Sequence, residues 1–134
     1  MLNGIIPSSW SGHIHAALRI MTGLLFMQHG MTKLLHWPAT DYFPAGQPLG
    51  AFMTVTGGLE LVGGLLIVIG LFTRITGFVL AGMMAVAYFM AHASQTFIPI
   101  QNGGELAIMF CFVFLYLASA GAGPFSLDDG RSKA

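Results

Sequence analysis

The sequence predicts an all-α fold, a bundle of four transmembrane helices in a polytopic membrane protein. Of its 134 residues, 55% are hydrophobic and only 7% are charged, whereas soluble domains carry about 25% charged residues. Four largely apolar runs follow one another, each near the length that crosses a bilayer as a helix. Clusters of glycine, proline and polar residues separate the runs and would end each helix. The length allows one domain, residues 1–134, and no second module.

The predicted helices follow in chain order, over residues 13–36, 49–72, 74–95 and 102–121. Pro38, Pro44 and Pro48 exclude a continuous helix between the first two, so we expect a loop there. Its aromatic residues favour the membrane interface, and the loop is either an anchored connector or a lid over a ligand. The turn before the third helix offers Thr73 as an N-cap. The polar tail, residues 126–134, is expected to be mobile.

Charge and cysteine content exclude several classes of function. Five basic and five acidic residues cancel, so no net positive field recruits nucleic acid. Cys111 is the single cysteine, which excludes an internal disulfide and a Cys-x-x-Cys redox pair. No set of residues has the spacing of a metal site, so no metal is expected. Four crossings put both termini on one side, and Arg74, Arg131 and Lys133 there, against Lys33 opposite, predict cytoplasmic termini.

The second helix is organised around Glu60, which stands in the middle of an apolar run. A carboxylate at that depth costs roughly 2.5–3.5 kcal/mol on insertion scales. Glycines before and after Glu60 allow a neighbouring helix backbone to approach closely in lipid. We therefore expect Glu60 to face the interior of the bundle and to pair with a basic residue. Arg19, on the inner half of the first helix, is the predicted partner.

Other ionisable residues gather at the outer ends of the helices. His29 and Lys33 are four apart and share a helix face, and His92 and Glu105 end or begin other helices. Three of them have a structural alternative: Lys33 snorkels to headgroups, His92 is interfacial, and Glu105 forms a capping box with Asn102. Together, however, they predict a path for a ligand, proton or ion. The candidate intramembrane site residues are Arg19, His29, Lys33, Glu60, His92 and Glu105.

An ordered series of short motifs carries a family resemblance. The motifs are Leu18-Arg19-Ile20, His29-Gly30-x-x-Lys33, Glu60-Leu61-x-Gly63-Gly64, Gly70-Leu71-Phe72-Thr73-Arg74, His92, Gly104-Glu105 and Gly121-x-Gly123-Pro124-x-Ser126-Leu127-Asp128. Over nearly its whole length the chain resembles the DoxX family of small bacterial membrane proteins. The resemblance implies a multi-pass protein of the inner membrane, linked to quinones and oxidative stress. It implies an oxidoreductase or the membrane subunit of one, and it indicates no particular catalytic residue.

Several functions remain open from the sequence. A quinone or quinol head group would find hydrogen-bond donors in Lys33, His29 and His92, with Glu60 or Glu105 passing protons. Alternatively, the bundle is a scaffold that docks a soluble redox enzyme, or it transports a small solute or protons as a homo-oligomer. His29 and His92 also permit bis-His haem ligation, but the resemblance does not imply haem and favours a quinone.

Overall fold

The computed structural model describes residues 4–132, and over that range the chain is helical and contains no strand. The all-α prediction is therefore confirmed for the described residues. The elements, in chain order, are η1 (Ser8–Trp10), α1 (Ser11–Leu35), α2 (Ala51–Ile69), α3 (Thr73–Ala87), η2 (Tyr88–His92), α4 (Pro99–Asn102), α5 (Glu105–Ala120) and α6 (Leu127–Ser132). Lys133, which entered the charge argument for topology, lies outside the described residues.

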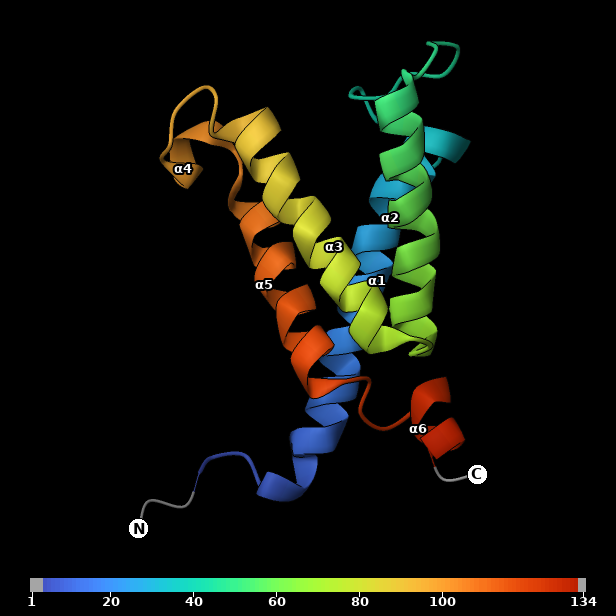
Figure 1. Ribbon diagram of the computed structural model, residues 1–134, viewed down its shortest axis with the longest axis vertical. Helices are drawn as coiled ribbons and strands as arrows, with labels where there is room; N and C mark the ends of the chain where they lie inside the picture. The colour runs from blue at the N-terminus through green and yellow to red at the C-terminus, as the bar shows by residue number, and fades with distance from the viewer. Residues whose placement is uncertain (1–3, 133–134) are drawn as a thin grey trace.

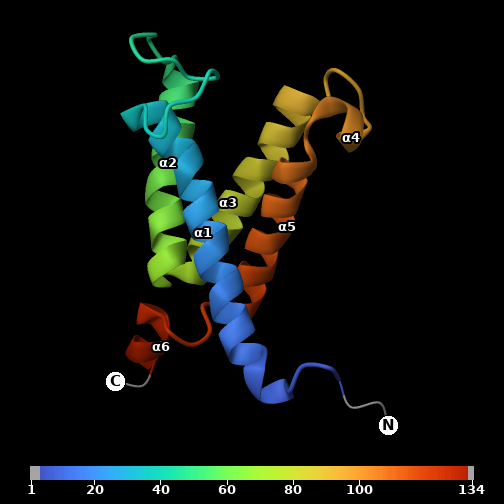
Figure 2. The ribbon, with the colours of Figure 1, turned by 180° about the vertical axis from the view of Figure 1, so that it is seen from behind.

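The long helices form two pairs that together make a V. Helix α1 packs along α2, and α3 packs along α5 (Figures 1 and 2). The pairs converge near the turn at residues 70–72, where α6 also lies; we call this the closed end. They diverge toward the loop at residues 36–50 and the segment at residues 93–104, which we call the open end.

Glycine brings α1 and α2 into backbone contact. A Cβ built on Gly30 of α1 would lie 2.5 Å from the carbonyl oxygen of Gly57 on α2. A Cβ on Gly64 would lie 2.8 Å from Cβ of Met27. Distances this short leave no room for any side chain at these positions. The prediction that glycines around Glu60 permit close approach of a neighbouring helix is confirmed.

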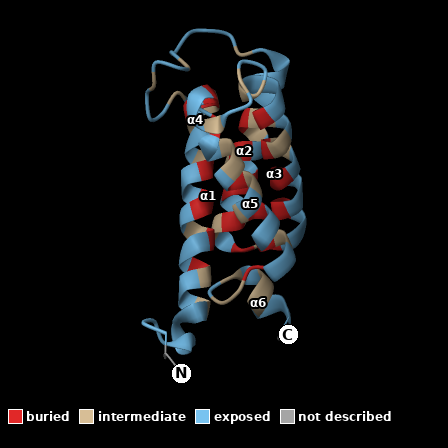
Figure 3. Ribbon diagram, turned by 90° about the vertical axis from the view of Figure 1, so that its left-hand side faces the viewer, coloured by how far each residue is buried: buried red, intermediate tan, exposed pale blue. Residues whose placement is uncertain are grey.

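A compact aromatic and aliphatic core joins the two pairs toward the closed end. Phe26 of α1 meets Phe114 of α5 edge to face, with ring centroids 4.7 Å apart. Ile67 of α2 and Leu80 of α3 are also fully buried in this cluster. Figure 3 shows the buried residues along the inner faces of the helices, with exposed residues outside. The core therefore holds the V together from its converging half.

The outer surface of the helices is apolar. Phe78 on α3 is 69% exposed and Phe112 on α5 is 64% exposed, and many aliphatic side chains are exposed beside them. Within residues 4–132, two helices are long and apolar enough to cross a membrane, α2 with 19 residues and α3 continued by η2 with 20. Helix α5 is apolar but has 16 residues. Such a surface is suited to lipid rather than to water.

Hydrogen bonds to the main chain hold the closed end together. Arg74 on α3 donates to the last carbonyl groups of α5, those of Ala118, Ser119 and Ala120. A cation there satisfies carbonyls that have no partner inside the helix and opposes the negative end of its dipole.

The tail caps another helix. Asp128 on α6 accepts hydrogen bonds from the Phe72 and Thr73 amides, at 2.9 and 2.8 Å. Two predictions are therefore wrong: residues 126–132 are docked, and Thr73 is the first residue of α3 while Asp128 supplies its cap. Partial burial of the Asp128 carboxyl acts to raise its pKa. The hydrogen bonds from these amides and the charge of Arg131 act in the opposite direction and are stronger together, so the pKa of Asp128 is lowered.

Candidate functional site

A buried ion pair joins α1 to α2. The Lys33 ammonium donates to both carboxylate oxygens of Glu60, at 2.6 and 2.8 Å, and only 8% and 5% of the two residues is exposed. The close contact of Gly30 with Gly57 sets the register of α1 against α2, and this register places Lys33 at the same height as Glu60. Glu60 does face the interior and does meet a cation, as predicted. Lys33 turns inward, so the alternative that it snorkels to outer headgroups is wrong.

The predicted pairing of Arg19 with Glu60 is wrong. Arg19 lies fourteen residues before Lys33 on α1, which is about 21 Å along a helix. It is completely buried at the closed end, where its Nη2 donates to the Phe125 carbonyl at 2.8 Å. The guanidinium also packs against Gly70 in the α2–α3 turn. The expected depths of Arg19 and Glu60 in the membrane suggested the pairing, but the register of α1 against α2 places Lys33 beside Glu60 instead.

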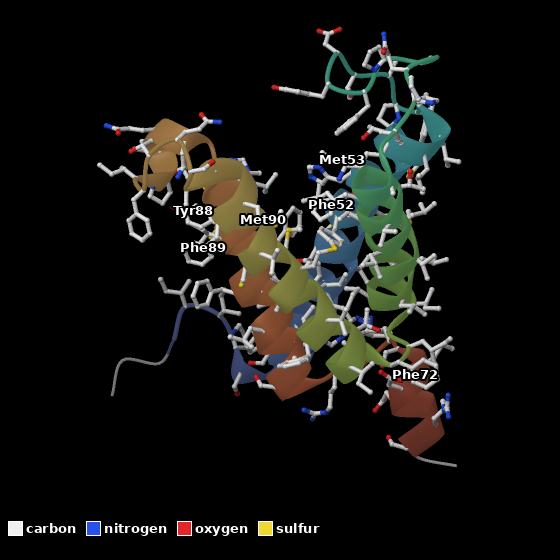
Figure 4. The ribbon with its side chains drawn as sticks, turned by 45° about the horizontal axis from the view of Figure 1, so that its top comes forward. Phe52, Met53, Phe72, Tyr88, Phe89 and Met90 are labelled. Carbon is white, nitrogen blue, oxygen red and sulfur yellow. The ribbon has the colours of Figure 1, made fainter. Side chains whose placement is uncertain are left out.

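A cleft of about 610 Å³ opens between the two helix pairs at the open end. Its polar lining comes from His29, Lys33, Thr56, Glu60 and His92. The rest is apolar and includes Phe26, Phe52, Met53, Leu59, Met84, Val86, Met90, Leu106 and Phe110. Figure 4 shows Phe52 and Met53 of α2 and Met90 of η2 at this open end, on the two arms of the V. The cleft thus has a small polar region and apolar walls, which is typical of ligand sites.

His29 is available to a ligand. Its ring faces the cleft and meets the Phe110 ring edge to face, with centroids 5.9 Å apart. Neither ring nitrogen has a hydrogen-bond partner within residues 4–132. Both nitrogens can therefore serve a bound molecule, one as donor and the other as acceptor in the neutral ring.

His92 of η2 is held in one orientation by Asn102 at the end of α4. Its Nδ1 donates to the Asn102 carbonyl at 3.0 Å, since a carbonyl can only accept. In the neutral ring this leaves Nε2 as an acceptor beside the cleft. The helix widens to a π-turn here, in which the Ala93 amide donates to the Tyr88 carbonyl at 2.9 Å. Such turns are frequent at functional sites.

Asn102 organises the segment that supports His92. Its amide nitrogen donates to the Thr96 carbonyl at 2.7 Å and to the Tyr88 hydroxyl at 3.2 Å. Its Oδ1 accepts from the Gly104 amide at 2.7 Å. Asn102 thus uses its polar atoms to tie the loop to η2. Sequence reasoning considered Asn102 only as a cap, because its partners come from separate turns.

Glu105 does not join the site. It is exposed in the first turn of α5, and it is not among the residues that line the cleft. Helix α5 has Gly104 as its N-cap and no side-chain cap bond, so the predicted capping box with Asn102 is absent. A carboxylate in the first turn still complements the helix dipole.

The loop at residues 36–50 folds over the ion pair. The Phe43 ring lies 5.6 Å from the Lys33 ammonium, within the range of a cation–π contact. Its carbonyl oxygen lies 3.4 Å from Nδ1 of His36. Sequence reasoning placed the loop aromatics at the interface and did not single out Phe43. Whether the loop is a connector or a lid stays a prediction.

The structure therefore brings together four of the six candidate residues. His29, Lys33, Glu60 and His92 line one cleft, whereas Arg19 and Glu105 lie elsewhere. Among residues 4–132, no group of three or more His, Cys, Asp or Glu side chains has the arrangement of a metal site.

Apolar outer faces, long apolar helices and a buried ion pair beside a cleft define a helical membrane protein. The family model for DoxX matches residues 14–93, and the chain belongs to the DoxX family. It is 40% identical over 117 residues to an uncharacterised protein of Haemophilus influenzae, covering 85% of this chain and 87% of that one. It is 30% identical over 112 residues to a Bacillus subtilis protein named "Putative oxidoreductase CatD", covering 83% and 81%. No solved structure gives a significant match.

Proposed function

We propose that this DoxX-family membrane protein binds a quinone or quinol head group in the cleft and acts as an oxidoreductase or as its membrane component. The observation that carries the proposal is the cleft itself, with four ionisable side chains at one place and apolar walls elsewhere. A planar ring with two oxygen atoms matches such a lining in shape and polarity. The name of the Bacillus subtilis relative supports a redox role.

The side chains of the cleft can satisfy both oxidation states. Two of the three N–H bonds of Lys33 serve Glu60, and the third is available to a quinone carbonyl. His29 can donate to a carbonyl, while Nε2 of His92 can accept from a quinol hydroxyl. Reduction of a quinone consumes two electrons and two protons. In the proposal the histidines hold protons, and a soluble redox enzyme docked at the membrane supplies the electrons.

In the membrane, we propose that α1, α2, α3 with η2, and α5 make four crossings of the bacterial inner membrane, with the closed end in the cytoplasm. Arg74 and Arg131 at the closed end support this orientation. Cysteine labelling with a membrane-impermeant maleimide tests it on intact cells. Tyr42→Cys at the open end should react from outside, and Ser132→Cys only after lysis. The reverse pattern would contradict the orientation.

Binding of a short-chain benzoquinone to the purified protein, measured by calorimetry, tests the site. His29→Phe and His92→Phe should each weaken binding at least tenfold, because each removes a hydrogen-bond partner at the ring. His13→Phe is the matched control: His13 lies on α1 at the closed end, with its ring against Phe125. Its affinity should stay within twofold of the wild type. No saturable binding, or equal affinity in all variants, would overturn the proposal.

A further inference from the structure

The cleft is closed on three sides by contacts between side chains. At its floor, Phe26 meets Phe110 edge to face, with centroids 5.1 Å apart. On the side between α1 and α5, the His29 ring contacts Phe110. On the loop side, Phe43 covers the Lys33 ammonium. The side between α2 and α3 lacks any such ring contact among the described residues.

The fourth side, between α2 and α3, is apolar and exposed. Val55 on α2 is 63% exposed, and across from it Val86 on α3 and Met90 on η2 are 52% and 61% exposed. All three line the cleft. Helices α2 and α3–η2 are also the two described helices that are long and apolar enough to cross a membrane. Exposed apolar side chains on helices of this length are suited to the hydrocarbon of a bilayer.

Gly82 leaves a gap in the α3 wall of this opening. It lines the cleft, and a Cβ built on it would meet nothing within 4 Å. Gly30, which packs against α2, differs in this respect, because a Cβ built on it would lie 2.5 Å from the nearest backbone atoms of α2. Gly82 lies nine residues after Thr73 and ten before His92, which is about 14 Å from either end of the span. Gly82 is therefore near the middle of a helix that is long enough to span the acyl chains.

We propose that the opening between α2 and α3 is a passage for a hydrocarbon chain, with Gly82 as the residue that determines its width. The ligand is then a membrane-soluble amphiphile with a prenyl or alkyl tail, and it enters sideways from the bilayer. A water-soluble quinone or catechol would make no use of this passage. The inference rests on the proposed function for the head group, and it adds a second binding subsite.

A pair of benzoquinones with the same head group, one without a tail and one with a decyl chain, tests the passage. Affinities are compared at equal concentration within the detergent phase, so that partitioning cancels. The wild type should bind the decyl compound at least tenfold more tightly than the tailless one. Gly82→Leu should abolish that difference and leave the tailless affinity within twofold, since a Cβ at position 82 meets no neighbour and the rest of the new side chain occupies the gap.

Gly58→Leu is the matched control, because a Cβ there also meets nothing within 4 Å but Gly58 does not line the cleft. Both changes replace a mid-helix glycine with a better helix former, so both variants should fold. The control should keep the tenfold preference for the decyl compound. Equal wild-type affinities for the two compounds, or the same loss in both variants, would overturn the passage while leaving the head-group proposal standing.

A second measurement tests whether a hydrocarbon chain enters the passage when no quinone head group is attached to it. A nitroxide is attached at Gly82→Cys or at Gly58→Cys, in a Cys111→Ala background, and n-decanol is added. The chain should immobilise the nitroxide at position 82 and leave the one at position 58 unchanged. Equal line broadening at both positions would overturn the passage. Absence of any quinone binding would instead defeat the head-group proposal alone.

Discussion

The two ends of this molecule hold their charged side chains in different ways. At the closed end, three charged groups bind the main chain: Arg19 donates to the Phe125 carbonyl, Arg74 to carbonyls that end α5, and Asp128 accepts from amides that begin α3. At the open end, Lys33 and Glu60 bind each other beside a cleft. Charges held by backbone groups fasten helix ends together. Charged groups that bind other side chains and line a cleft remain within reach of a ligand.

His15 and the two histidines that line the cleft show the same division. His15, on α1 at the closed end, donates from Nε2 to the Gly121 carbonyl at 2.9 Å and accepts at Nδ1 from the Tyr116 hydroxyl at 3.0 Å. Both of its nitrogens are occupied by the fold. At the open end, His29 has two nitrogens to offer and His92 has one. The presence of a polar residue in an apolar helix is therefore less informative than the identity of its partner.

The largest expected effect comes from breaking the ion pair at the open end. Glu60→Ala leaves the Lys33 ammonium buried without a partner, which should lower the free energy of unfolding by about 3–5 kcal/mol. Thermal unfolding in detergent measures it. Lys33→Met combined with Glu60→Leu should recover most of the loss, because no charge is left buried. Recovery on replacing Arg19 instead would contradict the pairing seen in the structure.

A smaller effect is expected at the closed end. Arg19→Met removes the charged hydrogen bond to Phe125 and should lower the free energy of unfolding by about 1.5–3 kcal/mol. Quinone affinity should stay within twofold, because Arg19 lies about 21 Å along α1 from Lys33. Calorimetry on the folded variant measures the affinity. A tenfold loss of affinity in a protein that is still folded would show that the two ends are not separate in function.

The smallest effect concerns the cap on α3. Asp128→Asn should lower the free energy of unfolding by about 0.5–2 kcal/mol at pH 7, near the lower figure because the carboxylate is partly solvated. The pKa of Asp128 is lowered in the folded state. Its contribution is therefore present above the unfolded pKa of about 3.9 and is lost as the pH falls through the folded value.

Melting temperatures from pH 7 down to pH 3 measure that dependence. The difference in melting temperature between the wild type and Asp128→Asn should become smaller below about pH 4. Asp41→Asn, which changes an exposed carboxylate in the loop at residues 36–50, is the control and should melt with the wild type at every pH. A difference in melting temperature that stays constant down to pH 3 would show that the Asp128 carboxylate does not act through its charge.

Much of this protein follows from local sequence. Its composition predicts helices with apolar faces, and Pro38, Pro44 and Pro48 predict the break before α2, because these properties act within a few residues. The glycines around Glu60 predict a close helix contact, and the cost of a carboxylate in lipid predicts a cationic partner.

Only the tertiary structure decided which cation that is, and which polar residues share a site. The contact of Gly30 with Gly57 sets the register of α1 against α2, and this register selects Lys33 over Arg19. The docking of α6, which supplies a cap for α3 from 55 residues away, likewise leaves no local signal. The physical reason is that composition and propensity act along the chain, whereas register and partner depend on backbone contacts between helices that are distant in sequence.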